Sequence, residues 1–187
     1  FLMKIGIAGV GGIGSNVARI LSQAGIDRIK IVDFDRVEAG NLNRQFYRMS
    51  QVGRKKTKSL AANLLEIHPD MTIEAVEKQL GPGDTAKIFS DCSVVVEGLD
   101  DRRLKKMMIE ELASLKIAVV SASGIAGPEM DAVHVRQMGN CHIVGDMVSD
   151  QDEYDLFPPK IGLITSIMAG IVLRLIEKPH TGSGGKG

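Results

Sequence analysis

Cysteine, net charge and long apolar runs are all scarce in this sequence, and each absence excludes a class of protein. The two cysteines, Cys92 and Cys141, can form neither a disulfide framework nor the Cys-x-x-Cys pairs that bind zinc. We therefore expect no structural zinc, and a cytoplasmic protein, because a reducing compartment suits free thiols. The sequence also has no Gly-Lys-Ser/Thr loop, which excludes a P-loop ATPase.

Charge and hydropathy exclude proteins that bind nucleic acid or membranes. Lys and Arg together number 23, as do Asp and Glu, so the formal net charge is zero. A protein that coats nucleic acid or an anionic membrane needs a positive surplus, and we expect neither partner. No uninterrupted apolar run approaches the roughly 20 residues that span a bilayer.

What the sequence does contain is a regular alternation of strand-like and helix-like segments. Strands are expected over residues 4–8, 29–32, 71–76, 93–96 and 117–122, and helices over residues 15–24, 55–67, 82–89 and 102–115. This alternation predicts an α/β fold with a doubly wound, mostly parallel sheet and helices on both faces. We expect a single domain over residues 1–180 and a flexible glycine-rich tail over residues 181–187.

The pattern changes in the C-terminal third. Residues 130–135 and 142–144 are expected to add short antiparallel strands, and residues 149–159 form an acidic loop. Residues 161–176 are nearly all apolar and predict a largely buried helix. Two helices carry apolar stripes that should face the core: Leu60, Ala61, Leu64 and Leu65 in the first, and Ile164, Ile167, Met168, Ile171, Val172 and Leu175 in the second.

A glycine loop follows the first expected strand. Residues 9–14 read Gly-Val-Gly-Gly-Ile-Gly, and a helix opens directly after them. Glycines let the backbone turn tightly and approach a phosphate, which then meets helix N-terminal amides. Asp33 ends the second strand, where a carboxylate can bind ribose hydroxyls and would repel a 2′-phosphate. The segment predicts a nucleotide site; the alternative is that the glycines serve close helix–sheet packing alone.

Cations follow at the carboxyl side of the predicted sheet, where ligands of open α/β folds bind. Arg44 lies in the run Asn-Leu-Asn-Arg-Gln, and Lys56 lies at the start of a helix. A dinucleotide pyrophosphate needs little beyond the glycine loop, whereas the β- and γ-phosphates of a triphosphate require cations such as these. A lysine cluster on a helix can also be a solvated face, and we adopt that interpretation for Lys58 and for one of Lys55 and Lys56.

Acidic residues follow the strand expected at residues 93–96. Asp100 lies at the carboxyl edge of the sheet, where a carboxylate could hold Mg²⁺ against phosphates. Alternatively Asp100 is only the N-cap of the next helix. Both roles coexist if Asp100 binds the metal and Asp101 caps the helix.

Together these motifs carry a family resemblance. GVGGIGSN, the DFD acid, NLNRQF, the G-x-x-K helix start and the Asp-Asp pair resemble the ThiF/MoeB/HesA adenylyltransferases, relatives of ubiquitin-activating enzymes, and most of all the short ThiF type. The resemblance spans about residues 3–177 and implies a Rossmann-like fold. It also implies that the C-terminal glycine carboxylate of a small ubiquitin-like, ThiS-like sulfur carrier ending in Gly-Gly attacks ATP·Mg²⁺. Acyl-adenylate forms and pyrophosphate leaves, for sulfur transfer in thiamine (thiazole) biosynthesis or a related pathway.

The resemblance also assigns site residues. The implied nucleotide-binding residues are Gly9, Gly11, Gly12, Gly14, Asp33, Asp35, Asn41, Arg44 and Lys56. Arg44, Lys56 and Asp100 are the implied catalytic residues, with Asp100 as the Mg²⁺ ligand. The family dimerises, so we expect a homodimer that uses Met107, Met108 and the helix at residues 161–176, with the carrier docked near residues 149–159.

The sequence departs from the family pattern in two places. Longer members carry zinc-binding Cys-x-x-Cys pairs and an N-terminal segment whose arginine enters the partner's ATP site, and neither is found in this sequence. Arg19 or Arg48 is expected to replace that arginine, unless the site works with fewer cations. Some relatives carry the sulfur protein on a cysteine near the position of Cys141; we favour a small core residue there, and core burial for Cys92.

Two alternatives from other classes stay open. An NAD-dependent oxidoreductase would use the glycine loop but would leave Arg44, Lys56 and Asp100 without a role. A non-catalytic adaptor for a ubiquitin-like protein would bind ATP without adenylating anything.

Overall fold

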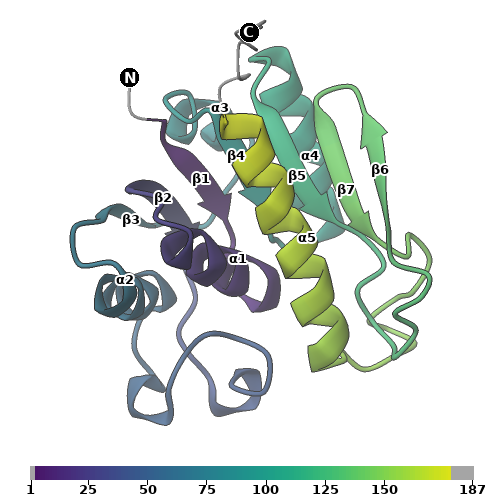
Figure 1. The fold of residues 1–187 in the computed structure, drawn as a ribbon, viewed down its shortest axis with the longest axis horizontal. Coiled ribbons are helices and arrows are strands. Elements are labelled where there is room, and N and C mark those ends of the chain that lie inside the picture. Colours follow the sequence, from purple (N-terminus) through teal and green to yellow (C-terminus); the bar gives the residue numbers. More distant parts are fainter. Residues whose placement is uncertain (1–2, 178–187) are drawn as a thin grey trace, which may run out of the picture.

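A mostly parallel sheet with helices on both faces forms the frame of the protein (Figure 1). The computed structural model describes residues 3–177, and the tail predicted over residues 181–187 lies outside them. Within the described part the seven strands lie in the order β3-β2-β1-β4-β5-β7-β6, and only the β6–β7 pair is antiparallel. The predicted fold class is thus confirmed, while the predicted domain boundary stays a prediction.

The strands are β1 (Ile5–Ala8), β2 (Arg28–Asp33), β3 (Thr72–Glu77), β4 (Val94–Glu97), β5 (Ala118–Ala122), β6 (His134–Met138) and β7 (Cys141–Gly145). The α-helices are α1 (Gly12–Gln23), α2 (Lys56–Ile67), α3 (Asp84–Ile88), α4 (Arg102–Ser114) and α5 (Pro158–Ile176). Two short 3₁₀ helices, η1 (Ala39–Asn41) and η2 (Met49–Gln51), interrupt the polar segment between β2 and α2.

Both faces of the sheet are covered, as a parallel sheet requires. Helices α1, α2 and α5 share one apolar core with the sheet, and α3 and α4 share the other (Figure 1). Because successive side chains of a strand point to opposite faces, β4 sends Val94 and Val96 into the first core and Val95 into the second. A near-continuous apolar run such as that of β4 is typical of a parallel strand that is buried on both faces.

The strand order reverses at β1, and this topology positions the site. β1 pairs in parallel with β2 on one side and β4 on the other, so that Ala8 lies level with both Val32 and Glu97. The residues that follow these three strands therefore meet at one edge of the sheet. Open α/β sheets bind their ligands at such a switch point.

Element boundaries differ from the prediction mainly in the C-terminal third. Met130–Val133 forms a turn, with the Val133 amide donating to the Met130 carbonyl at 3.0 Å, so β6 begins only at His134. β6 is an edge strand with every residue exposed, which explains why no apolar alternation marked it. β7 pairs with β5 in parallel, although its neighbour β6 runs antiparallel.

The apolar stripe of α2 is partly wrong. Leu60 and Leu64 are fully buried as predicted, but Leu65 is 39% exposed. The buried face of α2 is instead rotated toward Asn63, which donates from Nδ2 to the Phe46 carbonyl at 2.9 Å and accepts from Gln51 at Oδ1 at 2.7 Å. The irregular segment before α2 packs on the helix, and its buried backbone groups need these partners.

Helix α5 is the core helix of one face. Within residues 3–177 it is long and apolar enough to cross a membrane by length and composition alone, but it packs against α1 and strands β4, β5 and β7. Ile164, Met168 and Val172 are fully buried, as predicted, whereas Leu175 is 38% exposed. The high hydropathy of α5 is therefore explained by its place against the sheet.

Candidate functional site

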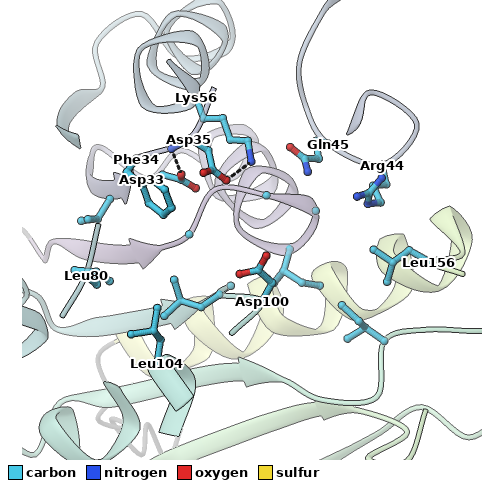
Figure 2. A pocket seen from close by; sticks show the side chains of 18 of the residues that line it. Asp33, Phe34, Asp35, Arg44, Gln45, Lys56, Leu80, Asp100, Leu104 and Leu156 are labelled. Carbon is cyan, nitrogen blue, oxygen red and sulfur yellow. Dashed lines mark hydrogen bonds and ion pairs between the residues drawn. The ribbon is translucent and has the colours of Figure 1, made fainter. Parts of the chain in front are cut away.

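A cleft lies at the carboxyl ends of β1, β2 and β4, at the switch point of the sheet (Figure 2). The predicted site residues that line it are Gly9, Gly11, Gly12, Asp33, Asp35, Arg44, Lys56 and Asp100. Gly14 and Asn41 do not belong to its lining. Residues separated by up to 91 positions in the sequence, from Gly9 to Asp100, thus meet in one space, because the parallel register aligns the strand ends.

The glycines divide into two kinds. A Cβ on Gly14 would overlap the carbonyl oxygen of Gly9, and Gly9 itself has φ of +78° and faces the Gly98 carbonyl at 2.6 Å from its own Cβ position. These two glycines let α1 start directly against the strand ends. A Cβ on Gly11 or Gly12 would meet no atom closer than 3.7 Å. Close packing therefore explains part of the motif, and an open backbone beside the cleft explains the rest.

Asp33 holds the glycine loop in place. Its carboxylate accepts hydrogen bonds from the amides of Val10 and Asp35, both at 2.8 Å. The Tyr47 hydroxyl donates to the Val10 carbonyl at 2.7 Å, so the same residue is fixed from both sides. Burial, and next the charges of Asp33 and Asp35, raise the pKa of Tyr47 and keep its hydroxyl a donor. A ribose could bind the Asp33 carboxylate beside these amides.

Arg44 is attached to the glycine loop through α1. Asn16 donates from Nδ2 to the carbonyls of Gly12 and Arg44, at 2.7 and 2.8 Å. The Ser15 hydroxyl accepts from the Phe46 amide at 3.0 Å. These bonds fix the backbone that carries Arg44 against the first turn of α1, and so place the guanidinium beside the loop.

Asn41 contributes to the site through its backbone, which forms the turn that carries Arg44. The Asn41 carbonyl accepts from the amides of Arg44 and Gln45, at 3.2 and 3.0 Å, so its backbone shapes the turn. The Arg44 guanidinium donates to the Gly40 carbonyl and to Asn43 Oδ1. Both acceptors are uncharged, and an anionic phosphate oxygen would be a stronger acceptor than either.

Lys56 is the lysine of its cluster that belongs to the cleft. It is 6% exposed, and its Nζ lies 2.9 Å from Asp35 Oδ2 (Figure 2). Lys55 turns to Glu77 at 2.7 Å, and its hydrogen bond lowers the pKa of that carboxyl. Lys58 is exposed, as expected. A buried ammonium requires an anionic partner, and a phosphate oxygen could share or replace Asp35 in that role.

Asp100 and Asp101 divide the two roles that the sequence left open. Asp101 is the N-cap of α4: its carboxylate accepts from the amides of Arg103 and Leu104 at 2.8 and 2.9 Å. Asp100 is exposed and faces the cleft, without a hydrogen bond to any described residue. The interpretation of Asp100 as a helix cap is therefore wrong, and its carboxylate is available to a ligand.

The donor set suits Mg²⁺ without requiring a protein cage. Within residues 3–177 no group of three or more His, Cys, Asp or Glu side chains could hold a metal. Mg²⁺ at nucleotide sites is commonly bound by one or two carboxylates together with substrate phosphates. The single carboxylate of Asp100 is therefore enough to hold the metal together with the phosphates.

The cleft also has lining residues that the sequence analysis missed. Phe34, Leu80 and Leu104 lie at one end of the cleft and offer a base an apolar wall, and Val32 also lines the cleft (Figure 2). Gln45 lines the polar end, where its Oε1 is buried without a partner among the described residues. Gln45 could have been found from its place beside Arg44. Leu80 and Leu104 carry no sequence signal, since only the fold brings them to this edge.

Neither candidate for a replacement arginine lies in the cleft. Arg48 forms a two-point ion pair with Glu66, at 3.0 and 2.5 Å. Arg19 donates to Gln23 at 3.1 Å and lies 5.8 Å from the ring centre of Phe46. The replaced arginine would serve the partner's ATP site, so the choice between Arg19, Arg48 and a site with fewer cations stays a prediction. Arg44, Lys56 and the exposed Lys78 are the cations that line the cleft in the described part of the chain.

Both cysteines are core residues. Cys141 lies in β7 and Cys92 precedes β4, and they are 3% and 6% exposed. Burial, and next the Glu97 charge, raise the pKa of the Cys141 thiol to about 11. Burial likewise raises the pKa of Cys92 to about 12. The predicted core role of both residues fits this geometry, and a reactive thiol at Cys141 does not.

Replacing Cys141 with alanine should therefore leave nucleotide binding and any catalytic rate within about twofold of the parent. At pH 8 a thiol with a pKa near 11 is ionised in only about one molecule in a thousand, so native alkylation by iodoacetamide should be slow. Mass spectrometry of the native and unfolded protein checks this. Rapid alkylation of Cys141 in the folded state would contradict the burial.

The chain is similar to one protein family over nearly its whole length and to several curated proteins over parts of theirs. A model of the ThiF family matches residues 2–184. The adenylyltransferase and sulfurtransferase UBA4 of Candida glabrata is 30% identical over 182 residues, covering 92% of this chain and 42% of that protein. Ubiquitin-like modifier-activating enzyme 5 of Bombyx mori is 38% identical over 87 residues, covering 46% of this chain and 22% of that protein. The chain thus spans about two fifths of the length of UBA4.

Solved structures share the fold. The E. coli tRNA N6-threonylcarbamoyladenosine dehydratase TcdA, in complex with AMP, has a TM-score of 0.84 at 21% identity and covers 92% of this chain and 85% of its own. Guanylylpyridinol- and ATP-bound HcgE of Methanothermobacter marburgensis has a TM-score of 0.78 at 19% identity and covers 92% and 94%. At these identities the likeness concerns the fold.

Proposed function

This chain belongs to the ThiF family, and we propose that it uses ATP to adenylate the C-terminal glycine carboxylate of a small ubiquitin-like sulfur carrier of the ThiS type. The pathway proposed is sulfur transfer for the thiazole of thiamine, in the cytoplasm. One observation carries the proposal: the glycine loop, Arg44, Lys56 and Asp100 line one cleft at the switch point. The names of UBA4 and of ubiquitin-like modifier-activating enzyme 5 support an adenylation or activation step.

The chemistry explains why this cleft has cations. A carboxylate oxygen must form a bond to the α-phosphorus of ATP while the bond to the β-phosphate bridging oxygen breaks and pyrophosphate leaves. Two unit charges about 4 Å apart repel by roughly 4 kcal/mol at an effective dielectric constant near 20. Arg44 and Lys56 would offset this repulsion at the phosphates. Mg²⁺ held by Asp100 would supply further positive charge to the β- and γ-phosphates.

The remaining residues bind and orient the nucleotide. Phe34 and Leu80 would contact the base, and Asp33 would accept from the ribose. The open backbone of Gly11 and Gly12 lets phosphates approach the first turn of α1. The acceptor arrives already ionised, so the reaction needs neither a protein nucleophile nor a general base. Catalysis therefore rests on position and charge.

The homodimer remains part of the proposal, with one change. Met108 is fully buried in the core and cannot contribute to an interface, whereas Leu163 on α5 is 37% exposed. We propose that α5 and the partly exposed Met107 contribute to dimer contacts, and that the carrier docks near residues 149–159, the last two of which begin α5. Sedimentation velocity at several concentrations tests the dimer.

Nucleotide binding is the first test. ATP·Mg²⁺ at about 100 times its Kd should raise Tm by about 5–10 °C, because a ligand that binds the folded state alone stabilises it. NAD should leave Tm unchanged. The reverse pattern would favour the oxidoreductase and contradict the proposal.

Pyrophosphate exchange into ATP separates the enzyme from an adaptor. Labelled pyrophosphate should enter ATP only when a ThiS-like carrier with a free Gly-Gly end is present. A panel of other Gly-Gly-ended small proteins would place the chain in another sulfur pathway if one of them drives exchange faster. ATP binding without exchange against any member of the panel would support the adaptor.

A further inference from the structure

A lysine is fully buried in the first turn of α5, where the local physics opposes a positive charge. Lys160 is 0% exposed and is the third residue of the helix. Burial removes the hydration of an ammonium, and the helix dipole places partial positive charge at the same end. The residues that follow on the buried face of α5, such as Ile161 and Ile164, are apolar. An apolar side chain would suit this place better, so the lysine needs another explanation.

Three segments meet at the ammonium of Lys160. Its Nζ donates to the Ala126 carbonyl and to Asp146 Oδ2, both at 2.6 Å, and lies 3.5 Å from Ser149 Oγ. An ammonium has three N–H donors, so these acceptors use its whole capacity and leave none for a ligand. Lys160 thus joins the start of α5 to the loop after β5 and to the loop after β7.

Asp146 fixes the loop after β7 from within. Its Oδ1 accepts from the amides of Val148 and Ser149, both at 2.8 Å. Burial alone would raise the pKa of Asp146, but its hydrogen bonds, first of all the one from Lys160, hold that pKa well below its usual range. The carboxylate is therefore ionised at neutral pH and supplies the negative charge that a buried ammonium needs.

The two loops approach each other more closely than ordinary side chains allow. A Cβ on Gly124 would lie 1.9 Å from Asp146 Oδ1. Met147 adopts a φ of +65°, which is unfavourable for a residue with a side chain. Backbone strain of this kind persists only where the surroundings hold it, and the pair of Lys160 and Asp146 supplies that hold.

The same loops form the wall of the nucleotide cleft at its phosphate end. Gln151 and Leu156 line the cleft, and both share a further space with Arg44. Leu156 also pairs in an isolated bridge with Ala126, whose carbonyl accepts from the buried lysine. Figure 2 shows Arg44 and Leu156 toward one end of the cleft and Leu80 toward the other. The lysine is therefore linked to the end that faces Arg44.

Resting on the proposed nucleotide site, we propose that Lys160 and Asp146 are positioning residues for the triphosphate. Neither contacts the nucleotide. The pair holds the wall that carries Gln151 and Leu156 opposite Arg44, so that the phosphate end of the cleft keeps its shape. The base and ribose lie at the other end and do not depend on it. Since a buried ion pair can often be replaced by apolar residues without loss of stability, stability alone does not explain this pair.

The test variant replaces both members of the pair, as Asp146→Asn with Lys160→Met. Removing the lysine alone would leave a buried carboxylate without its cation, whereas the asparagine oxygen still accepts from the two loop amides. The matched control is Asp91→Asn with Lys30→Met. Lys30 is 5% exposed and lies 2.7 Å from Asp91 Oδ1, and neither residue lines the nucleotide cleft. Urea unfolding should give the test variant a midpoint close to that of the parent.

Calorimetric titration then compares ATP·Mg²⁺ with AMP, which lacks the β- and γ-phosphates. The affinity of the test variant for ATP should fall about tenfold or more, since loss of a group that orients a binding site commonly costs that much. Its affinity for AMP should stay within about twofold, because the base and ribose end is unchanged. The control variant should bind both nucleotides as the parent does.

Equal losses for ATP and AMP would indicate a structural role alone and overturn the inference. Unchanged ATP affinity in the test variant, or the same ATP-only loss in the control, would overturn it as well. If the test variant does not fold, Asp146→Asn with Lys160→Gln keeps a donor for the Ala126 carbonyl and is expected to lose affinity for ATP alone. The comparison needs no acceptor, so pyrophosphate exchange of the parent tests the proposed function separately.

Discussion

Replacing Arg44 with alanine should reduce carrier-dependent pyrophosphate exchange by about a hundredfold or more. Arg44 is the arginine that lines the phosphate end of the cleft, and loss of one preorganised donor to developing charge typically costs that much. The fold should persist, because among the described residues the guanidinium hydrogen-bonds only to the neighbouring Gly40 carbonyl and the Asn43 side chain. Exchange rate, ATP affinity and circular dichroism are the measurements.

The matched control for Arg44 is Arg48→Ala. Arg48 lies on the same polar segment but forms an exposed ion pair with Glu66, outside the cleft. Exposed pairs contribute little, so this variant should exchange at close to the parent rate. Normal exchange by Arg44→Ala, or an equal loss in both variants, would show that Arg44 does not act on the phosphates.

Gly14→Ala should cost about 3 kcal/mol or more in the free energy of unfolding. Gly14 lies inside α1, where alanine is otherwise the better helix former by about 1 kcal/mol. Here the added Cβ would overlap the Gly9 carbonyl oxygen and lie 3.0 Å from Ile7 Cγ2. Both neighbours are held by the sheet, so the first turn of α1 must move, and overpacking of this kind is costly.

Gly162→Ala provides the control, because it makes the same change in α5. A Cβ on Gly162 would meet no atom within 4 Å, so this variant should gain up to about 1 kcal/mol from helix propensity. Urea unfolding of both variants measures the difference. If Gly14→Ala proved as stable as Gly162→Ala, α1 would have to start further from β1 than described.

The local parts of the site could be predicted from sequence. The glycine loop, Asp33 and Lys56 each belong to a short motif tied to a strand end or a helix start, and such motifs fix backbone position within a few residues. Arg44 was likewise recoverable from the run that contains it. A doubly wound, mostly parallel sheet could be predicted because the alternation of strands and helices leaves few topologies for such a chain.

Contacts between distant segments could not be predicted. Leu80 and Leu104 line the cleft only because β3 ends beside β2 and α4 begins just after β4. Leu65 was assigned to the core from helical spacing, but the buried face of α2 is rotated away from it toward Asn63, which binds the Phe46 carbonyl of the preceding segment. Asp100 and Asp101 are indistinguishable in sequence, and only the direction of α4 decides which carboxylate caps it.

The double engagement of Asp33 has a consequence for protein engineering. The carboxylate of Asp33 faces the cleft and also accepts a hydrogen bond from the Val10 amide. The Tyr47 hydroxyl donates to the carbonyl of the same residue. A swap at this position, intended to change which sugar is accepted, would release the loop together with the ribose. Redesign of nucleotide preference must therefore begin with a substitute anchor for Val10, so that recognition and architecture can be altered one at a time.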